Sequence, residues 1–416
     1  MVEKYYRFCR VGVIALLFAS ALLINLWFPG DIFEFPKFLA LVLVVGILSF
    51  AHLLQGYFGK FPEFSLKHLK KETLLATVFV VGNIFAYIFS TVPENSLIGS
   101  PMRFQGVLPQ IFYIFLAINS FLFFVQYKKG EEVFSWLKIV LLAVCLLALS
   151  PYLLGDFYPF YIFAPEFFYD RVYGTFGNPN YLAVFIVGTL PIVFWNFRKQ
   201  RAFNTSLLIL ALVTLFLTGS RSAFVALIVS GLIFLKNRKV FWGYIVSVLV
   251  FFVMVLLVNI GFWQNSSALQ RLNLDRENLT SVETRFSLWK AGGEMFLDRP
   301  IFGYGQDAID KNIEKYLPES LKLNEVFYID RTHNEFIDKL LTGGIFVFLS
   351  YVGLIGLILF SAFKFEGLSL LIFLAFLNLN IFHFLNFSTI SSNILLYFFM
   401  GFLFATLYRN RIISSE

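Results

Sequence analysis

Hydrophobic positions fall into long runs that are separated by short polar connections. A membrane-spanning helix needs about 20 mostly apolar residues. Twelve runs approach this length, at residues 9–28, 38–54, 73–92, 108–126, 134–154, 180–197, 203–218, 222–235, 240–262, 336–363, 367–384 and 389–408. The run 222–235 is short, but leaving it out would place the two termini on opposite sides of the membrane. The pattern predicts an all-α polytopic membrane protein with about twelve transmembrane helices.

The charges of the connections predict the orientation of these spans. Short cytoplasmic loops carry an excess of Lys and Arg. With the N-terminus inside, the inner segments hold 19 Lys and Arg residues and the short outer loops hold four, namely Lys37, Arg103, Arg171 and Arg221. The bias therefore predicts that both termini are cytoplasmic.

The composition narrows the class of protein further. Hydrophobic residues make up 58% of the chain and charged residues 14%, which excludes an ordinary soluble domain. The net charge of +7 is explained by topology, so the expected partner is the lipid bilayer and not nucleic acid. The first apolar run lacks a cleavage site and is interpreted as a signal anchor. Cys9 and Cys145 both fall in spans, where we expect them to pack as small apolar residues.

One outer connection is much longer than the others and divides the chain into three regions. These are residues 1–262 with nine spans, the loop 263–335, and residues 336–416 with three spans. Loops of this length are usually functional. Residues 280–283, Thr-Ser-Val-Glu, form a capping box that predicts the start of a helix with Phe286, Trp289, Gly293 and Phe296 on one face. A second polar helix is predicted at 306–317, so the loop is expected to form a helical cap on the membrane surface.

Arg221 stands in the short polar segment Gly219-Ser220-Arg221-Ser222 on the predicted outer side. An arginine near hydrocarbon costs about 2.5–3.5 kcal/mol at a span centre and is expected to face a cavity or a partner. The alternative is an arginine that reaches to the lipid headgroups. The small neighbours would let an anion approach, and the N-terminus of the next helix would add amide donors. We therefore interpret Arg221 as part of an anion site.

Two further residues on the outer side are candidates for chemistry. Arg285 falls in the first turn of the predicted cap helix, where the helix dipole disfavours a cation, although a solvated surface arginine is an equal alternative. His333 lies where the long loop enters the membrane, and a neutral imidazole is suited to take a proton near pH 7. A histidine that caps the span is the alternative. His383, inside a span, is interpreted as a helix-packing residue.

Four short motifs occur in a fixed order on the predicted outer side. They are Gly-Thr-Phe-Gly-Asn-Pro-Asn at 174–180, in which Asn180 is predicted to cap the next span, then 219–222, then 284–289 with 300–305, and Asp-Arg-Thr-His-Asn at 330–334. In order and spacing the chain resembles the O-antigen ligase and O-antigen polymerase superfamily. Gly344 fits the glycine that follows the His-Asn pair in ligases, whereas Val347 departs from the small or aromatic residue expected three positions later.

The resemblance implies a fold and an activity. The fold would be GT-C-like with a periplasmic cap, in the bacterial inner membrane, with the active site facing the periplasm. The enzyme would transfer a glycan from undecaprenyl diphosphate to an acceptor hydroxyl with inversion, and without a metal or other cofactor. Arg221 and Arg285 would hold the diphosphate through their guanidinium groups, and His333 would activate the acceptor. Supporting roles would fall to Asn334 and Asp330, which could orient the imidazole or the acceptor, and to Arg171, Asn180 and Ser220.

The acceptor stays open at this point. A ligase would use a lipid A core sugar, a polymerase the glycan of another lipid-linked repeat, and a protein O-oligosaccharyltransferase a protein hydroxyl. A secondary transporter or lipid flippase is the alternative from another class. Transporters tend to contain inverted repeats and interrupted spans with ionisable groups near the midplane. No such repeat is visible here, and the polar candidates gather on one side.

Overall fold

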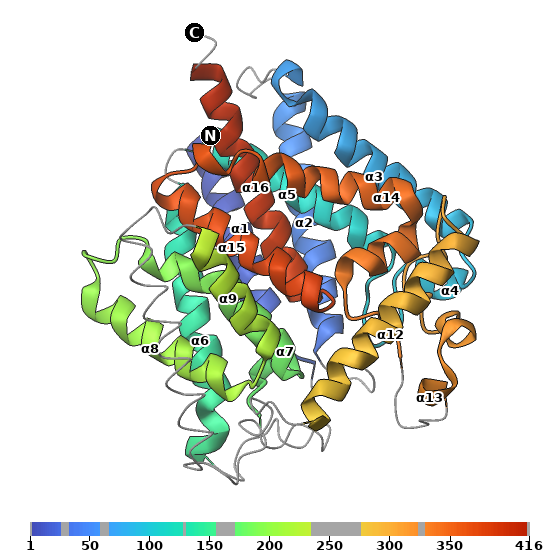
Figure 1. The fold of residues 1–416 in the computed structure, drawn as a ribbon. Helices are drawn as coiled ribbons and strands as arrows, with labels where there is room; N and C mark the ends of the chain where they lie inside the picture. The colour runs from blue at the N-terminus through green and yellow to red at the C-terminus, as the bar shows by residue number, and fades with distance from the viewer. Residues whose placement is uncertain are drawn as a thin grey trace.

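The computed structural model describes residues 2–25, 33–58, 66–127, 130–154, 171–233, 276–322 and 329–413, and every regular element in these ranges is a helix (Figure 1). Within these ranges, eight helices are long and apolar enough to cross a membrane. Their cores are α1 (Val2–Leu22), α2 (Glu34–Tyr57), α3 (Lys70–Ile88), α5 (Val107–Gln126), α6 (Val133–Leu154), α14 (Glu335–Leu359), α15 (Gly367–Leu385) and α16 (Ile390–Ile413). The chain is therefore a multi-pass helical membrane protein, as predicted.

Three other predicted spans are apolar helices of fewer than 18 residues. They are α7 (Pro179–Thr189), which continues as the 3-10 helix η7 (Leu190–Phe194), α8 (Arg201–Leu217) and α9 (Arg221–Ile233). The change of helix type after Thr189 coincides with Pro191, which has no N–H to donate in an α-helical ladder. The remaining predicted span, 240–262, lies outside the described residues. The described residues thus contain eight helices of span length and three shorter apolar helices, and the full set of about twelve spans stays a prediction.

Helix α16 forms the centre of the bundle (Figure 1). In the apolar stretch of α16, 94% of the residues are buried, whereas 33% are buried in the corresponding stretch of α1. It packs along α5, α14 packs along α3, and α15 contacts both α16 and α9. Gly401 allows α16 to approach α5 closely, because a Cβ at this position would lie 2.3 Å from the Ala117 carbonyl oxygen of α5. Figure 1 also shows the first turn of α1 and the last turn of α16 at the same end of the bundle.

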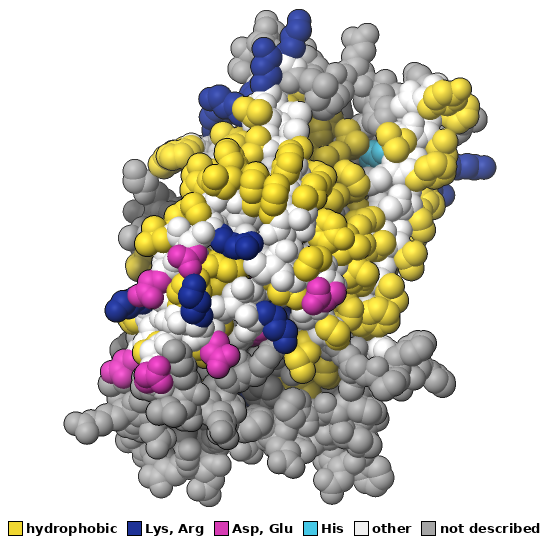
Figure 2. Space-filling model, turned by 90° about the vertical axis from the view of Figure 1, so that its right-hand side faces the viewer, with side chains coloured by type: hydrophobic (Ala, Val, Ile, Leu, Met, Phe, Trp, Pro, Cys, Tyr) yellow, Lys and Arg dark blue, Asp and Glu magenta, His cyan; other side chains and the backbone are white. Residues whose placement is uncertain are grey.

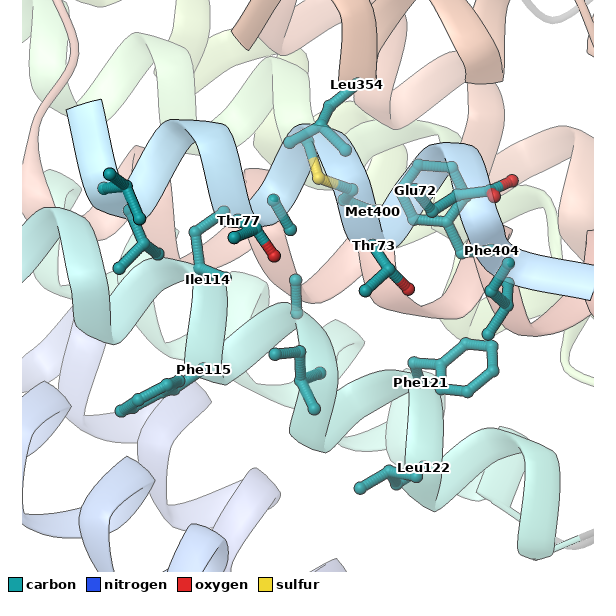
Figure 3. Close-up of a pocket in the computed structure, with 16 residues that line it drawn as sticks. Glu72, Thr73, Thr77, Ile114, Phe115, Phe121, Leu122, Leu354, Met400 and Phe404 are labelled. Atoms are coloured by element: carbon teal, nitrogen blue, oxygen red, sulfur yellow. The ribbon is translucent and has the colours of Figure 1, made fainter. Parts of the chain in front are cut away.

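The surface of the bundle suits a lipid environment. Figure 2 shows hydrophobic side chains in a broad band over one face, with acidic side chains confined to its lower half. An apolar groove of about 750 Å³ lies between α3 and α5 and is closed at the back by α14 and α16 (Figure 3). Phe115 and Ile118 at its rim are 41% and 45% exposed. Side chains of this kind are expected to contact lipid.

The described part of the predicted outer loop contains one long helix, α12 (Arg276–Asp298), which ends where the Asp298-Arg299-Pro300 signal predicted. Its start was predicted wrongly, because α12 already includes residues 276–279 and the Thr-Ser-Val-Glu segment lies within the helix. The buried face is formed by Leu288, Ala291 and Met295, whereas Phe286 on the predicted aromatic face is 63% exposed. The residues before 280 are compatible with a helix, so α12 starts at Arg276 and the segment 280–283 does not cap it.

The second predicted cap helix, at 306–317, does not form. Residues 306–312 are turns, followed by the 3-10 helix η8 (Ile313–Tyr316) and the short α13 (Glu319–Lys322) after Pro318. Asp307 has a φ of 51°, which no helix allows. Its carboxylate accepts hydrogen bonds from the amides of Ser100 and Gln105, so tertiary contacts determine this backbone conformation.

Helix α14 is broken at Gly344, which has φ 68° and ψ −171°. The turn at residues 300–305 fills the break. The amides of Tyr304 and Gly305 donate to the carbonyls of Leu341 and Thr342 at 2.8 and 3.1 Å, and Ile345 N donates to Pro300 O at 2.9 Å. Irregular backbone at membrane depth is tolerated where protein groups satisfy it. The cap is thereby fixed to the helix whose first turn follows His333.

Gly344→Ala is expected to lower the free energy of unfolding by about 1–3 kcal/mol, because its backbone conformation is restricted to glycine. A Cβ there would also lie 2.1 Å from the Ile301 carbonyl oxygen. The measurement is the thermal unfolding midpoint in detergent. Gly356→Ala in the same helix is the matched control, since the nearest atom to its Cβ would be 3.7 Å away. Equal midpoints for the two variants would contradict the role of Gly344.

Candidate active site

Arg221 is the first residue of α9 and follows a sharp turn after α8. Gly219 has a φ of 61°, and its amide donates to Phe216 O at 2.9 Å. Arg171 is buried and its Nε donates to Thr218 O at 2.7 Å, which fixes the turn from behind. Ser220 is 2% exposed, and its Oγ has no hydrogen-bond partner among the described residues. The half-buried Arg221 thus combines with a helix N-terminus and a buried hydroxyl, as an anion site requires.

Arg285 comes to this site from α12. Its Nη1 donates to the Leu385 carbonyl, at the end of α15, at 2.9 Å. We predicted Arg285 in the first turn of its helix. Because α12 begins at Arg276, Arg285 lies in the third turn instead. Burial and the positive charge of Arg221 both lower the pKa of Arg285. The two arginines, 64 positions apart in the sequence, are therefore near enough to repel each other.

His333 lies in a strained backbone conformation at the start of α14. Its φ is 57°, which is uncommon for a residue other than glycine. The neighbouring residues hold it there. Trp289 Nε1 donates to Thr332 O at 3.1 Å, and the Thr332 amide and hydroxyl donate to Asp338 Oδ1 at 2.9 and 2.7 Å. Strain that is maintained by such contacts often marks a functional position.

Asn334 does not orient the imidazole through its side-chain oxygen. That oxygen caps α14 by accepting the amides of Phe336 and Ile337 at 3.0 and 3.2 Å. The capping role that we considered for His333 thus belongs to its neighbour. The imidazole is left to face the site. Its ring lies 5.3 Å from the Phe387 ring, and its Nδ1 is buried without a hydrogen-bond partner among the described residues.

Charged neighbours act on His333 from several elements. Burial lowers the pKa of His333 most, and the positive charges of Arg285 and Arg103 lower it further. The Asp330 carboxylate and the Asn386 side chain act in the opposite direction and raise it. The net direction is downward from the ordinary value of about 6.5. The imidazole is consequently neutral at pH 7, in the form that accepts a proton.

Arg103 and Asp330 form an ion pair beside His333. Arg103 Nε lies 2.6 Å from Asp330 Oδ2, and both side chains are about one-fifth exposed. The guanidinium of Arg103 also lies 4.5 Å from the Phe387 ring centre and 5.8 Å from that of Tyr181. Phe387 therefore contacts both Arg103 and His333, and it connects the pair to the imidazole.

The loop that carries Arg103 is fixed by the turn at 303–307. Ser96 Oγ donates to Gln306 O at 2.8 Å, and Asp307 receives the amides of Ser100 and Gln105. Asp307 also forms a buried ion pair with Arg331. Two motifs that lie far from Arg103 in the sequence, around 303–307 and 330–334, thus act together to position Arg103.

The motif at 174–180 positions the start of α7, which contacts the site. Asn178, and not Asn180 as we predicted, caps α7, since its Oδ1 accepts the Asn180 amide at 2.8 Å. The reason is that Pro179, with its fixed φ, is the first helical residue. Lys37 is fully buried and donates to the Thr175 carbonyl at 3.1 Å. The motif serves to place the start of α7, whose Tyr181 contacts Phe387.

The turn between α15 and α16, residues 385–389, is where these groups meet. The Glu335 amide donates to Asn386 O at 3.1 Å, and Ser388 N donates to the Glu335 carboxylate at 2.9 Å. His383 beneath it contacts Ser392 at 3.0 Å, as expected for a helix-packing residue. Phe387 was not predicted as a site residue, and Arg103 was predicted only as a topological charge, although an arginine near hydrocarbon is expected to have a partner there as at Arg221.

The candidates predicted from the sequence occupy different places in this arrangement. Arg221, Arg285, His333 and Asp330 form one cluster, linked by the charge effects described above. Arg171 and Ser220 shape the turn before Arg221, while Asn180 lies in the first turn of α7. Among the described residues no three His, Cys, Asp or Glu side chains come together as metal ligands. Two arginines beside a neutral histidine suit the binding of an anionic leaving group next to a base.

Fold and site together define a polytopic helical membrane protein with an arginine–histidine cluster at one end of its bundle. Residues 206–352 match the family model described as O-antigen ligase, which supports the resemblance to the O-antigen ligase and polymerase superfamily. The matched segment contains Arg221, Arg285 and His333. The family of the matched model implies, in general, a membrane glycosyltransferase of the O-antigen ligase or polymerase type. A comparison with curated proteins found no match.

Proposed function

We propose that this protein transfers a glycan from undecaprenyl diphosphate to an acceptor hydroxyl, with the lipid A core as acceptor. The observation that carries the proposal is the convergence of Arg221, Arg285 and His333 from three separate segments. The charge of Arg221 lowers the pKa of Arg285, and the charge of Arg285 lowers that of His333. An anion between the arginines would relieve this repulsion next to a group that can accept a proton.

The donor diphosphate would lie against Arg221 and Arg285. Guanidinium groups pair bidentately with phosphate oxygens, so two of them neutralise much of the diphosphate charge. The buried Ser220 hydroxyl and the first-turn amides of α9 would provide further donors. As the bond between the anomeric carbon and the phosphate oxygen breaks, its electron pair remains on the diphosphate. The arginines stabilise the charge that develops there.

His333 would act as the general base. In the proposed step, the acceptor hydroxyl gives its proton to the imidazole while its oxygen forms a bond to the anomeric carbon from the side opposite the leaving diphosphate. This attack inverts the anomeric configuration. Asp330 and Asn386, which raise the pKa of His333, would stabilise the imidazolium that results. Arg103 would position Asp330 through their ion pair.

The setting of the enzyme belongs to the same proposal. The protein would lie in the bacterial inner membrane with both termini in the cytoplasm, the site facing the periplasm and twelve spans in a GT-C-like arrangement. Residues 263–335 would form the periplasmic cap between the regions 1–262 and 336–416. The bias of Lys and Arg toward the predicted inner loops supports this orientation.

Transfer is expected to continue in the presence of a metal chelator. The two arginines supply the positive charge that a divalent ion would otherwise supply to the diphosphate. The measurement is the rate of glycan transfer by purified protein with EDTA, and again with added Mg²⁺ or Mn²⁺. Restoration of a lost activity by the divalent ion would contradict the two-arginine account.

The test of the function is reconstitution of the purified protein in liposomes with an undecaprenyl-diphosphate-linked glycan and, in turn, each acceptor. Transfer to lipid A core would support the ligase assignment. Transfer only to a second lipid-linked repeat, or only to a protein hydroxyl, would replace it with the polymerase or the protein O-oligosaccharyltransferase. Movement of the lipid-linked glycan across the bilayer without any transfer would point to a flippase and overturn the proposal.

A further inference from the structure

A polar pocket of about 240 Å³ lies beside the arginine–histidine cluster. Three segments form it: residues 95–103, which follow the start of α4 (Pro93–Ser96), the turn at 307–311, and residues 330–331. We call it the outer pocket. Its charged side chains are Arg103, Lys311, Arg331, Asp307, Asp310 and Asp330. Ligand sites for drug-sized molecules are larger, about 300–1,000 Å³, so this pocket suits a ligand of one or two small rings.

The charges of the outer pocket balance each other. Arg331 pairs with Asp307, Arg103 with Asp330 at 2.6 Å, and Lys311 with Asp310 at 3.8 Å. The site at Arg221 and Arg285 differs, because two positive charges act on one another there. No group of three acidic, His or Cys side chains in the described ranges could hold a metal ion. A pocket with many polar groups and no net charge favours a neutral, hydroxyl-bearing ligand over an anion or a cation.

One wall of the outer pocket is shared with the environment of His333. Arg103 and Asp330 line the pocket, and the charges of both act on the His333 imidazole. Arg103 also stacks on Phe387, which contacts the His333 ring. Arg285 acts on the same imidazole from α12, which contributes no residue to the pocket lining. The imidazole therefore has the anion site and the neutral polar pocket as separate neighbours.

We propose that the outer pocket binds the sugar of the acceptor and directs its hydroxyl toward His333. The inference rests on the proposed function, because it assigns the second substrate of that reaction. Carboxylate, guanidinium and amide groups together can donate to and accept from the several hydroxyls of one sugar ring. Of the lining residues, Asp310 and Asn95 belong to the pocket and not to the ion pair beside His333. They are specificity residues for the acceptor.

Asp310→Asn keeps the shape of the side chain and removes its charge. We expect the KM for the acceptor to rise about tenfold, as for loss of a hydrogen bond to a charged group, while the KM for the donor stays within about twofold. The assay uses the purified full-length protein, an undecaprenyl-diphosphate-linked glycan, and the glycolipid fraction of a strain that lacks the enzyme. Asn95→Ala is the second variant, in case the first does not fold. Glu314→Gln, an exposed acid outside the pocket, is the matched control.

Photo-crosslinking tests occupancy of the pocket without turnover. Cys9 and Cys145 are buried, so a benzophenone maleimide would label a cysteine placed by Lys311→Cys selectively. We expect light-dependent capture of the glycolipid acceptor at position 311 and not at the control, Glu314→Cys. Capture of the donor, or equal capture at both positions, would overturn the inference.

The two proposals fail in different ways. If wild-type protein transfers the glycan and Asp310→Asn and Asn95→Ala both match Glu314→Gln in acceptor KM, the outer pocket is not the acceptor site and the proposed function stands. If wild-type protein transfers no glycan but Lys311→Cys captures the glycolipid, the pocket assignment stands and the transfer reaction is wrong.

Discussion

Replacing Arg221 with alanine is expected to reduce glycan transfer about a thousandfold while the protein still inserts and folds. The removed guanidinium is proposed to bear the charge of the leaving diphosphate, and losses of this size follow removal of such groups elsewhere. Arg221 is half-buried at the start of α9, and Gly219 and Arg171 fix the turn that precedes it. The measurements are initial rates of transfer and the thermal unfolding midpoint.

Two further variants separate the charge from the geometry of Arg221. Arg198→Ala removes the same charge at an exposed position before α8 and should leave transfer unchanged. Arg221→Lys keeps the charge but loses the planar fork, so we expect an activity between those of wild type and Arg221→Ala. Addition of donor should raise the unfolding midpoint of wild type but not of Arg221→Ala. Full activity of Arg221→Ala would exclude its role with the diphosphate.

Four cations lie in the loops that the charge bias predicts to be on the outer side. They show how much of the site could be predicted from the sequence, and they are Lys37, Arg103, Arg171 and Arg221. Lys37 and Arg103 were predicted only as exceptions to a topology rule, whereas Arg221 was predicted as an anion ligand and Arg171 as a supporting residue of the site. In the structure, Lys37 holds the Thr175 carbonyl, Arg171 holds the Thr218 carbonyl, and Arg103 pairs with Asp330. All four thus lie at or behind the site. A cation near hydrocarbon costs free energy unless it contacts a partner, and Lys37, Arg171 and Arg103 each have such a contact.

The long loop shows where sequence reasoning fails. Its local signals, a capping box at 280–283 and an apparent helix at 306–317, describe what short segments favour in isolation. Contacts made across more than 200 positions determine what forms instead, as the bonds of Asp307 to the amides at Ser100 and Gln105 show. No periodicity in the loop encodes those partners. The long apolar runs were predicted well because each span satisfies its own backbone and depends little on its neighbours.

The convergence of Arg285 with Arg221 and His333 could not be derived from spacing. Nothing in the sequence of α12 says that its third turn lies over the end of α15, where Arg285 donates to Leu385. That placement depends on the break at Gly344, which lets the 300–305 turn dock on α14 and so fixes the C-terminal end of α12. The four motifs follow one another along the sequence, but tertiary contacts determine their association.

His333→Ala is expected to lower kcat by about 10²–10⁴-fold and to leave the KM for the donor nearly unchanged, because a general base acts in the chemical step. His333→Asn is the sharper variant. Asparagine tolerates the left-handed backbone that His333 adopts at φ 57°, so a loss of kcat there reflects chemistry and not backbone strain. His68→Ala, at the opposite end of the bundle, is the control. Equal loss of kcat and donor binding in His333→Asn would argue against a base.

The pH dependence of transfer provides an independent test of the same assignment. Burial and the charge of Arg285 lower the pKa of His333, so the neutral base persists as the pH falls below 6.5, and kcat/KM should decline only at lower pH. Bound diphosphate would offset the charges of Arg221 and Arg285, and the pKa of His333 would then rise in the complex. The acid limb of kcat should therefore lie at higher pH than that of kcat/KM. Arg285→Gln should move the kcat/KM limb upward in the same direction, and a downward movement would contradict electrostatic coupling between Arg285 and the base.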